Sequence, residues 1–298
     1  MTKPDGSRLV AIVLNWRDAA RTIKCVESLA AMSEVDVVVV VDNESTGELA
    51  DLSAQLSPSV IDKMELMPVR ENRGFAGGMN VAFESQTVLE AEFILALNND
   101  AYLDRLSLNK LLDALRQRPD AGAVGPVVRN LDGSVQSQGA ALTRTGLRIS
   151  QSAGSPDYLT WACVLLRGDA LHEVGALDER FFMYWEDYDY GLRLRQQGWE
   201  LLLVDDASVA HELSASGSSV GDLLRTYYAE SLLMFAIKWW RVRGTKPWVH
   251  FVAIALSRVA RRDGSGLVAI AAAIPGAIRF SRERRVRDEE VPRWASKA

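Results

Sequence analysis

Cysteine and histidine are scarce in this sequence of 298 residues, and their scarcity excludes whole classes of protein. Only two cysteines are present, Cys25 and Cys163, with no CxxC pair, and there are three histidines. We therefore expect neither a disulfide framework nor a structural zinc site, which fits a reducing cytoplasm. The opening apolar run is short, contains Asn15 and is not followed by a small-residue cleavage site, so no secretory signal is expected.

Long hydrophobic runs and two common nucleotide-binding motifs are also missing. The longest uncharged stretch, 264–278, has 15 residues and contains Pro275, which is short of the ~20 residues that a membrane-spanning helix needs. There is no GxGxxG motif, which disfavours a Rossmann dinucleotide site. The first strand-like run is followed by NWRDAA and not by a glycine-rich basic loop, which disfavours a nucleotidyltransferase.

Charge is distributed unevenly along the chain. Residues 1–220 carry 19 Lys and Arg against 32 Asp and Glu, whereas residues 221–298 carry 15 against 7. An acidic body with a basic tail indicates that the tail meets an anionic partner such as a membrane surface. The alternative is a set of solvated helices.

Strand-like and helix-like segments alternate through the first two-thirds of the chain. Short β-branched runs are typical of strands buried on both faces of a parallel sheet. The expected strands are 8–14, 35–41, 65–69, 93–97, 121–128 and 160–166, and the expected helices are 19–31, 47–56, 77–85 and 107–117. Residues 131–156 contain a turn and a loop-rich stretch. The alternation predicts a doubly wound, mostly parallel α/β sheet.

Polar residues directly follow three of the expected strands. They are Asn15, the pair Asp42 and Asn43, and the triplet Asn98–Asp100. Ligands of open α/β sheets bind beyond the carboxyl ends of the strands, so we expect these residues to line one crevice. Oxygen ligands at 98–100 suit Mg²⁺ or Mn²⁺, although Asn-Asn-Asp is also a common turn sequence.

Two further segments could carry chemistry. In NRGFAGGMN, 72–80, glycines precede a helix whose first turn is expected to include Asn80, and such a helix start can bind phosphate. In FFMYWEDYDYGLRLR, 181–195, the adjacent carboxylates Glu186 and Asp187 lie among aromatics. Like charges shielded from water raise a pKa and suit a general base. Part of this charge has a structural explanation, since Asp189 and Arg193 have the spacing of a helical ion pair.

Together these segments resemble the bacterial family 2 glycosyltransferases, particularly the rhamnosyltransferase-like members. The resemblance spans residues 8–220 in the expected order. It is carried by VLNW at 13–16, VDNES at 41–45, NRGFAGGMN at 72–80, LNND at 97–100, the segment 175–199 and His211.

The resemblance implies a GT-A-type catalytic domain over 1–220, followed by a helical, basic segment over 221–298. It implies that Asp187 is the catalytic base with Glu186 beside it, and that Tyr184 and Trp185 lie on the acceptor side. Asp100 and His211 would bind Mg²⁺ or Mn²⁺; Asn98 stands where a strict DxD motif has Asp. The residues implied to bind the donor are Asn15, Asp42, Asn43, Asn72, Arg73, Gly74, Asn80, Asn98 and Asn99.

The implied function is inverting transfer of a sugar from a nucleoside-diphosphate donor to a glycan or polyprenyl-linked acceptor in cell-surface polysaccharide assembly. L-rhamnose from dTDP-rhamnose is the leading donor. The WEDYDYGLR element also resembles that of galactofuranosyltransferases, which use UDP-galactofuranose, and a non-catalytic nucleotide-sugar-binding subunit is a third possibility. Nucleic acid is not an expected partner.

The basic tail is expected to form helices at 223–240, 248–261 and 266–280. Trp239, Trp240 and Trp248 and the flanking basic residues suit helices that lie on an anionic membrane surface, at the inner face of the cell membrane. The alternative is a helical bundle that packs on the catalytic domain or forms a homodimer.

Overall fold

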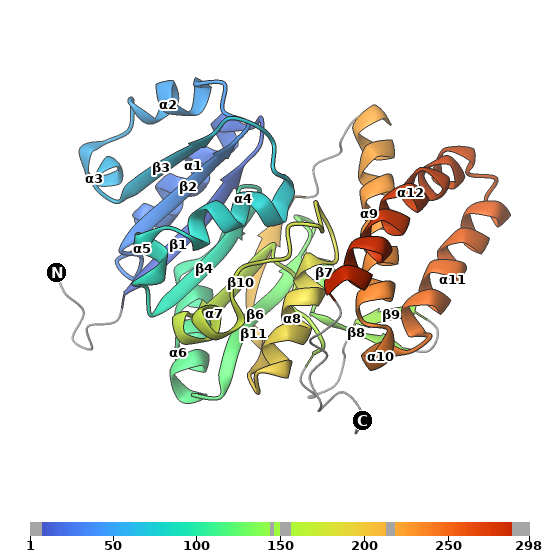
Figure 1. Ribbon diagram of the computed structural model, residues 1–298. Coiled ribbons are helices and arrows are strands. Elements are labelled where there is room, and N and C mark those ends of the chain that lie inside the picture. The colour runs from blue at the N-terminus through green and yellow to red at the C-terminus, as the bar shows by residue number, and fades with distance from the viewer. Residues whose placement is uncertain (1–7, 144–145, 150–155, 213–217, 288–298) are drawn as a thin grey trace.

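The computed structural model describes residues 8–143, 146–149, 156–212 and 218–287, and it shows a large mixed sheet covered by helices on both faces (Figure 1). The strand order is β3-β2-β1-β4-β10-β6-β11-β5, with β7 paired to β6, and β8 and β9 form a separate hairpin. The strands are β1 (Leu9–Asn15), β2 (Val37–Asn43), β3 (Met64–Val69), β4 (Phe93–Asn98), β5 (Ala101–Leu103), β6 (Ala121–Arg129), β7 (Val135–Ser137), β8 (Ala140–Thr143), β9 (Gly146–Ile149), β10 (Cys163–Arg167) and β11 (Glu200–His211).

The helices of the α/β body connect these strands. They are α1 (Ala19–Ala30), α2 (Glu48–Ser53), α3 (Pro58–Ile61), α4 (Gly74–Phe83), α5 (Gln86–Leu89), α6 (Arg105–Gln117), α7 (Gly168–Val174) and α8 (Glu186–Gln196). Four more follow, namely α9 (Ser218–Lys238), α10 (Trp240–Arg243), α11 (Lys246–Ala260) and α12 (Gly264–Arg287).

The central strands are apolar on both faces because both faces are covered. In β1, Leu9 and Val13 belong to a core cluster with residues of α1 and α6, whereas Val10 and Ile12 belong to a second cluster with residues of α4. Strands β3, β2, β1 and β4 pair in parallel with one another, and β6 pairs in parallel with β11. The doubly wound, mostly parallel sheet predicted from the sequence is confirmed.

The central strand predicted near 160–166 is present as β10, which runs antiparallel to β4 and β6. Two other local predictions were wrong. Residues 131–156, expected to be loop-rich, contain β7, β8 and β9, which are too short to give a periodic pattern. Helix α4 begins at Gly74 and not near Gly77, so Asn80 lies in its second turn.

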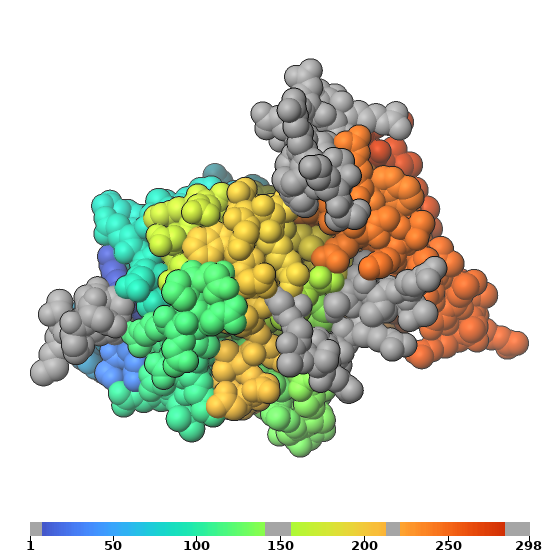
Figure 2. Space-filling model, turned by 90° about the horizontal axis from the view of Figure 1, so that it is seen from below, coloured from blue at the N-terminus to red at the C-terminus, as the bar shows by residue number. Residues whose placement is uncertain are grey.

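The C-terminal helices form a lobe beside the α/β body (Figures 1 and 2). One aromatic core cluster contains Phe181, Trp185 and Tyr188 from the body together with Phe235 of α9 and Trp239, which lies between α9 and α10. The parts predicted as 1–220 and 221–298 therefore share a core. By length and composition alone, Gly264–Glu283 within α12 is apolar enough to cross a membrane, yet its Ala273 and Phe280 are buried in core clusters with residues of α9.

Candidate active site

Polar side chains at the carboxyl ends of β1, β2 and β4 form one hydrogen-bonded row. Asn15 Nδ2 donates to Asp42 Oδ1 at 2.7 Å, and both residues are 3% exposed. Thr22 of α1 donates to Asn15 Oδ1 at 2.8 Å and accepts from Asn99 Nδ2 at 2.9 Å. The parallel register brings the strand ends to one sheet edge, as the sequence predicted.

The same edge holds a carboxylate–imidazole pair. His211 Nε2 lies 3.0 Å from Asp100 Oδ1 and 3.4 Å from Asn98 Nδ2, because β11 pairs with β5 just after the 98–100 turn. On the other side of the ring, Nδ1 lies 2.8 Å from Gln136 Oε1 of β7. The contact with Gln136 orients the ring so that Nε2 faces Asp100, the arrangement in which both residues can bind one cation. Among the described residues no cluster of three His, Cys, Asp or Glu could hold a metal ion, so this pair would share a cation with other ligands.

The adjacent acids Glu186 and Asp187 begin α8, which is directed toward this edge by the topology. Helix α8 is joined by a short turn to β11 and packs back along it, so its first turn points toward the end of β11 that carries His211. The loop before α8 also touches the start of α4, where Phe75 N donates to Phe182 O at 2.7 Å.

Burial raises the pKa values of both acids. The pKa of Asp187 is raised by desolvation to about 7, although its carboxylate accepts a 2.7 Å hydrogen bond from Tyr188 N. The pKa of Glu186 is raised well above its usual value by desolvation and by the charge of Asp187. Glu186 Oε2 is buried and has no hydrogen-bond partner within the described residues. The predicted raised-pKa pair is therefore present, and a carboxyl that ionises near neutrality suits a general base.

The backbone in front of this pair is strained. Tyr184 and Trp185 both have φ of +68°, in the left-handed region that aromatic residues rarely adopt. Such strain concentrates at functional sites, where the surrounding packing holds it in place. Both were predicted to face the acceptor, but only Tyr184 is exposed. Trp185 is 4% exposed and packs among Tyr188, Tyr228 and Phe235, so its role is to support the loop from within.

The segment 72–80 differs from what was expected of it. Asn43 and Asn72 hold the loop: Asn43 Nδ2 donates to Asn72 Oδ1 and Gly74 O, and Asn43 Oδ1 accepts from Arg73 N at 2.9 Å. Gly74 has φ of +72°, and an added Cβ would overlap the carbonyl oxygen of Phe182. The first N–H groups of α4 are used within the protein, by Asn72 Oδ1 and Phe182 O. The contacts therefore assign these residues to shaping the loop rather than to binding phosphate.

Arg73 and Asn80 are likewise committed to protein contacts. Arg73 Nη2 lies 3.0 Å from both carboxylate oxygens of Glu179. Asn80 donates to Leu177 O and Glu179 Oε1 and accepts from Leu177 N, and it is 3% exposed. Both residues anchor the 177–179 loop to α4, and their predicted contacts with the donor stay a prediction.

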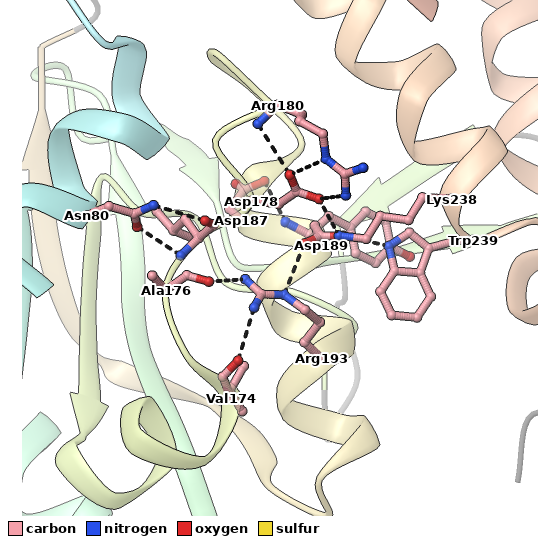
Figure 3. A network of polar contacts seen from close by, with 12 residues as sticks. Asn80, Val174, Ala176, Asp178, Arg180, Asp187, Asp189, Arg193, Lys238 and Trp239 are labelled. Atoms are coloured by element: carbon pink, nitrogen blue, oxygen red, sulfur yellow. Dashed lines mark hydrogen bonds and ion pairs between the residues drawn. The ribbon is translucent and has the colours of Figure 1, made fainter. Parts of the chain in front are cut away.

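A buried network ties the start of α8 to the C-terminal lobe (Figure 3). The side chain of Asp189 is fully buried, and it binds Arg193 at 3.1 Å, the predicted helical pair. It also accepts from Trp239 Nε1 at 2.8 Å and pairs with Lys238 Nζ at 2.6 Å. Lys238 pairs in turn with Asp178 at 2.7 Å, so one cation joins both ends of the loop that carries Tyr184 and Trp185.

Sequence reasoning missed several residues of this region. Thr22 and Gln136 connect the edge residues, and Tyr228 and His250 of the C-terminal lobe pack against Trp185. Gln136 lies in a stretch expected to be loop, and Tyr228 and His250 lie in helices expected to be peripheral. No local pattern in the sequence marked them, because their positions depend on long-range packing.

Comparison with known proteins agrees with this geometry. The sequence model of the protein family described as glycosyltransferase-like family 2 matches residues 6–229. The chain belongs to glycosyltransferase family 2. The L-rhamnosyltransferase of Mycobacterium tuberculosis that acts on N-acetylglucosaminyl-diphospho-decaprenol is 28% identical over 269 residues, covering 78% of this chain and 86% of that protein. The dTDP-rhamnosyl transferase RfbF of Shigella flexneri is 22% identical over 215 residues and covers 70% of each chain.

Solved structures show the same fold for this family 2 glycosyltransferase. A mannosyltransferase from Pyrobaculum calidifontis, solved with GDP-Man and Mn²⁺, superposes with a TM-score of 0.59 at 17% identity, covering 94% of this chain and 80% of that one. Staphylococcus aureus TarS residues 1–349 superpose with a TM-score of 0.53 at 16% identity, covering 96% and 93%. The predicted GT-A-type α/β fold is confirmed.

Proposed function

We propose that this glycosyltransferase is inverting and metal-dependent, and that it transfers L-rhamnose from dTDP-rhamnose to a glycan or polyprenyl-linked acceptor in cell-surface polysaccharide assembly. The two rhamnosyltransferase relatives support the donor sugar, and the decaprenol-linked substrate named for one of them supports a lipid-linked acceptor. The observation that carries the proposal is the raised pKa of Asp187 on a helix directed toward the Asp100–His211 pair.

The donor and its cation would lie at the sheet edge. Asn15 and Asp42 are the residues we assign to the nucleotide, with Asn98 and Asn99 beside the diphosphate. Asp100 and His211 fit Mg²⁺ or Mn²⁺, because such ions commonly take one or two protein ligands and complete their shell with water and substrate phosphate. In the free protein Asp100 Oδ1 and His211 Nε2 lie 3.0 Å apart, and a bound cation would replace this contact. The cation would offset the charge that develops on the leaving diphosphate.

The base would act on the acceptor hydroxyl. Asp187 takes the proton as the hydroxyl oxygen attacks the anomeric carbon, and the bond from that carbon to the diphosphate oxygen breaks on the opposite face. One displacement of this kind inverts the anomeric configuration. Desolvation and the charge of Asp187 both raise the pKa of Glu186. Tyr184, which is exposed in front of the pair, is the residue we assign to acceptor contact.

A donor screen tests this proposal. Thermal unfolding is measured with dTDP-rhamnose, UDP-galactofuranose and other nucleotide sugars, with and without Mn²⁺, and transfer is then followed with the donor that stabilises the protein. We expect a Mn²⁺-dependent shift with dTDP-rhamnose. A shift with UDP-galactofuranose alone would move the assignment to galactofuranosyl transfer. Binding without transfer to any polyprenyl-diphosphate-linked glycan would favour a non-catalytic binding subunit.

A further inference from the structure

The outward side of α11 is apolar although no described part of the chain covers it. Val249, Val252, Leu256 and Val259 follow one another at helical spacing, and Leu256 is 63% and Val259 58% exposed. We call these four residues the outer face. The opposite side of α11 is apolar too, because Phe251 and Ile254 pack against core clusters of the lobe. A helix that is apolar on both sides buries one side in its own fold and leaves the other for a partner.

Further apolar surface lies on the neighbouring elements. Val268 of α12, which packs beside α11, is 69% exposed. Ile237, Trp240, Thr245 and Trp248 line an open, apolar hollow of about 670 Å³ where α9, α10 and α11 meet. Tryptophans at such a rim are typical of proteins that meet the boundary between lipid and water. Figure 2 shows the lobe projecting from the α/β body.

The surroundings of the outer face are strongly cationic. Residues 240–262 contain six Arg and Lys and no Asp or Glu. Two of the six are paired within the fold, Arg243 with Asp157 and Arg258 with Asp263. Within the described ranges, no ion pair within 4.0 Å involves Arg241, Lys246, Arg261 or Arg262. Three of these, Arg241, Arg261 and Arg262, are exposed.

We propose that the outer face of α11, with its cationic surroundings, docks this protein on an anionic lipid bilayer. The positive charge around the outer face favours an anionic bilayer over a second copy of the chain. Two copies meeting at this face would bring their Arg and Lys side chains together, and residues 240–262 contain no acidic residue to neutralise them. Anionic headgroups complement the arginines while the valines and Leu256 enter the boundary between headgroups and acyl chains. Helix α12 lies on the bilayer in this arrangement and does not cross it, since its inner side is packed against α9.

Docking would place the acceptor side of the site near the lipid. His250, next to Val249 but on the inner side of α11, has its ring 5.8 Å from that of Trp185, and its Nε2 lies 3.3 Å from Tyr228 Oη. Trp185 directly precedes Glu186 and Asp187. Trp185 and α11 thus lie between the acid pair and the outer face. A lipid-anchored acceptor could reach the pair from the bilayer. This last step rests on the proposed function, whereas docking itself does not.

Vesicle sedimentation with the full-length protein tests the docking. Sucrose-loaded vesicles of phosphatidylcholine alone, or of phosphatidylglycerol and phosphatidylcholine in equal amounts, are mixed with the protein at low and high salt. We expect binding to the anionic vesicles only, weakened at high salt. The variant V252Q/L256Q/V259Q should bind at least tenfold more weakly, and R241Q/R261Q/R262Q should do the same. The matched control I61Q/L106Q/L131Q replaces exposed apolar residues of the α/β body and should bind as the unaltered protein does.

Each other outcome overturns the proposal. The docking is refuted if the unaltered protein stays in the supernatant with anionic vesicles, or if the outer-face variant binds as well as the control variant. Light scattering on the same proteins, without vesicles, measures their oligomeric state and so tests whether a second copy of the chain binds the outer face. A dimer that V252Q/L256Q/V259Q converts to a monomer would assign the face to self-association. Because all six replaced apolar residues are exposed, the thermal unfolding of both variants should match that of the unaltered protein. The outcome of the donor screen described above does not depend on the outcome of this vesicle test.

Discussion

Replacing the carboxyl of Asp187 by an amide should stabilise the protein while removing its activity. Asn is nearly isosteric with Asp and can still accept the hydrogen bond from Tyr188 N, so the substitution removes a charge and little else. The pKa of Asp187 in the folded protein is about 7, against 3.8 for the ordinary group. Since each pKa unit corresponds to about 1.4 kcal/mol, the ionised carboxylate costs the folded state at most roughly 4 kcal/mol. Partial solvent access and the favourable position in the first turn of α8 reduce this to about 2 kcal/mol.

The sign of the pH dependence follows from the raised pKa. Stability associated with Asp187 is fully present below its unfolded pKa near 4 and is lost as pH rises to about 7. The gain from Asp187→Asn should therefore be largest at pH 8 and less than half as large at pH 5. For a chain of this size, about 2 kcal/mol corresponds to a rise in Tm of roughly 5 °C.

Two measurements on Asp187→Asn check this reasoning: thermal unfolding at pH 5 and pH 8, and the rate of sugar transfer. The unfolding measurement does not require the physiological acceptor. The rate should fall by roughly 10²-fold or more, while the thermal shift produced by the donor is kept. Glu186→Gln is the matched control: desolvation and the charge of Asp187 raise the pKa of Glu186, so the amide should imitate its protonated form and change Tm at pH 8 less than Asp187→Asn does. An equal Tm change at both pH values, or full activity in Asp187→Asn, would refute the assignment of Asp187 as a buried base.

Three further substitutions test the supporting structure. Gly74→Ala should lower the free energy of unfolding by about 2–3 kcal/mol in chemical denaturation, because a Cβ would overlap Phe182 O at a positive φ; Gly133→Ala, at a positive φ in open space, should cost less. Lys238→Met should cost about 3 kcal/mol, read from Tm, because it removes the cation that pairs with both Asp178 and the fully buried Asp189 and leaves Arg193 as the cation paired with Asp189; Lys246→Met, outside that network, should cost little. Gln136→Ala should weaken the apparent Mn²⁺ affinity in the transfer assay about tenfold while leaving Tm within a few degrees, because it frees the orientation of the His211 ring.

The parts of the fold that the sequence predicted are those whose pattern is local. Runs such as Val37–Val41 are apolar on both faces, and the strands they form occupy the sheet centre. Residues that follow such runs, including Asn15, Asp42 and Asp100, were placed at one edge because parallel strands end together. The direction of β10 and the pairing of β7 could not be read in the same way, since strand direction depends on the path of the whole chain.

The contacts within 72–80 that the sequence did not predict have a common physical cause. Arg73 and Asn80 carry residue types that bind phosphate and ribose, and the sequence alone cannot show that the 177–185 segment supplies partners for them. Asn43 and Asn72 bind each other and the backbone of Arg73 and Gly74. Glu179 takes the side chains of Arg73 and Asn80, and Phe182 O takes the N–H of Phe75. The polar groups of 72–80 that could bind a ligand are thus the same groups that hold the strained loop before α8 in place. It follows that a substitution in 72–80 should change activity through the position of the loop carrying Tyr184 and Trp185, and a loss of kcat in Asn80→Ala with unchanged thermal shift by the donor would separate that role from direct donor binding.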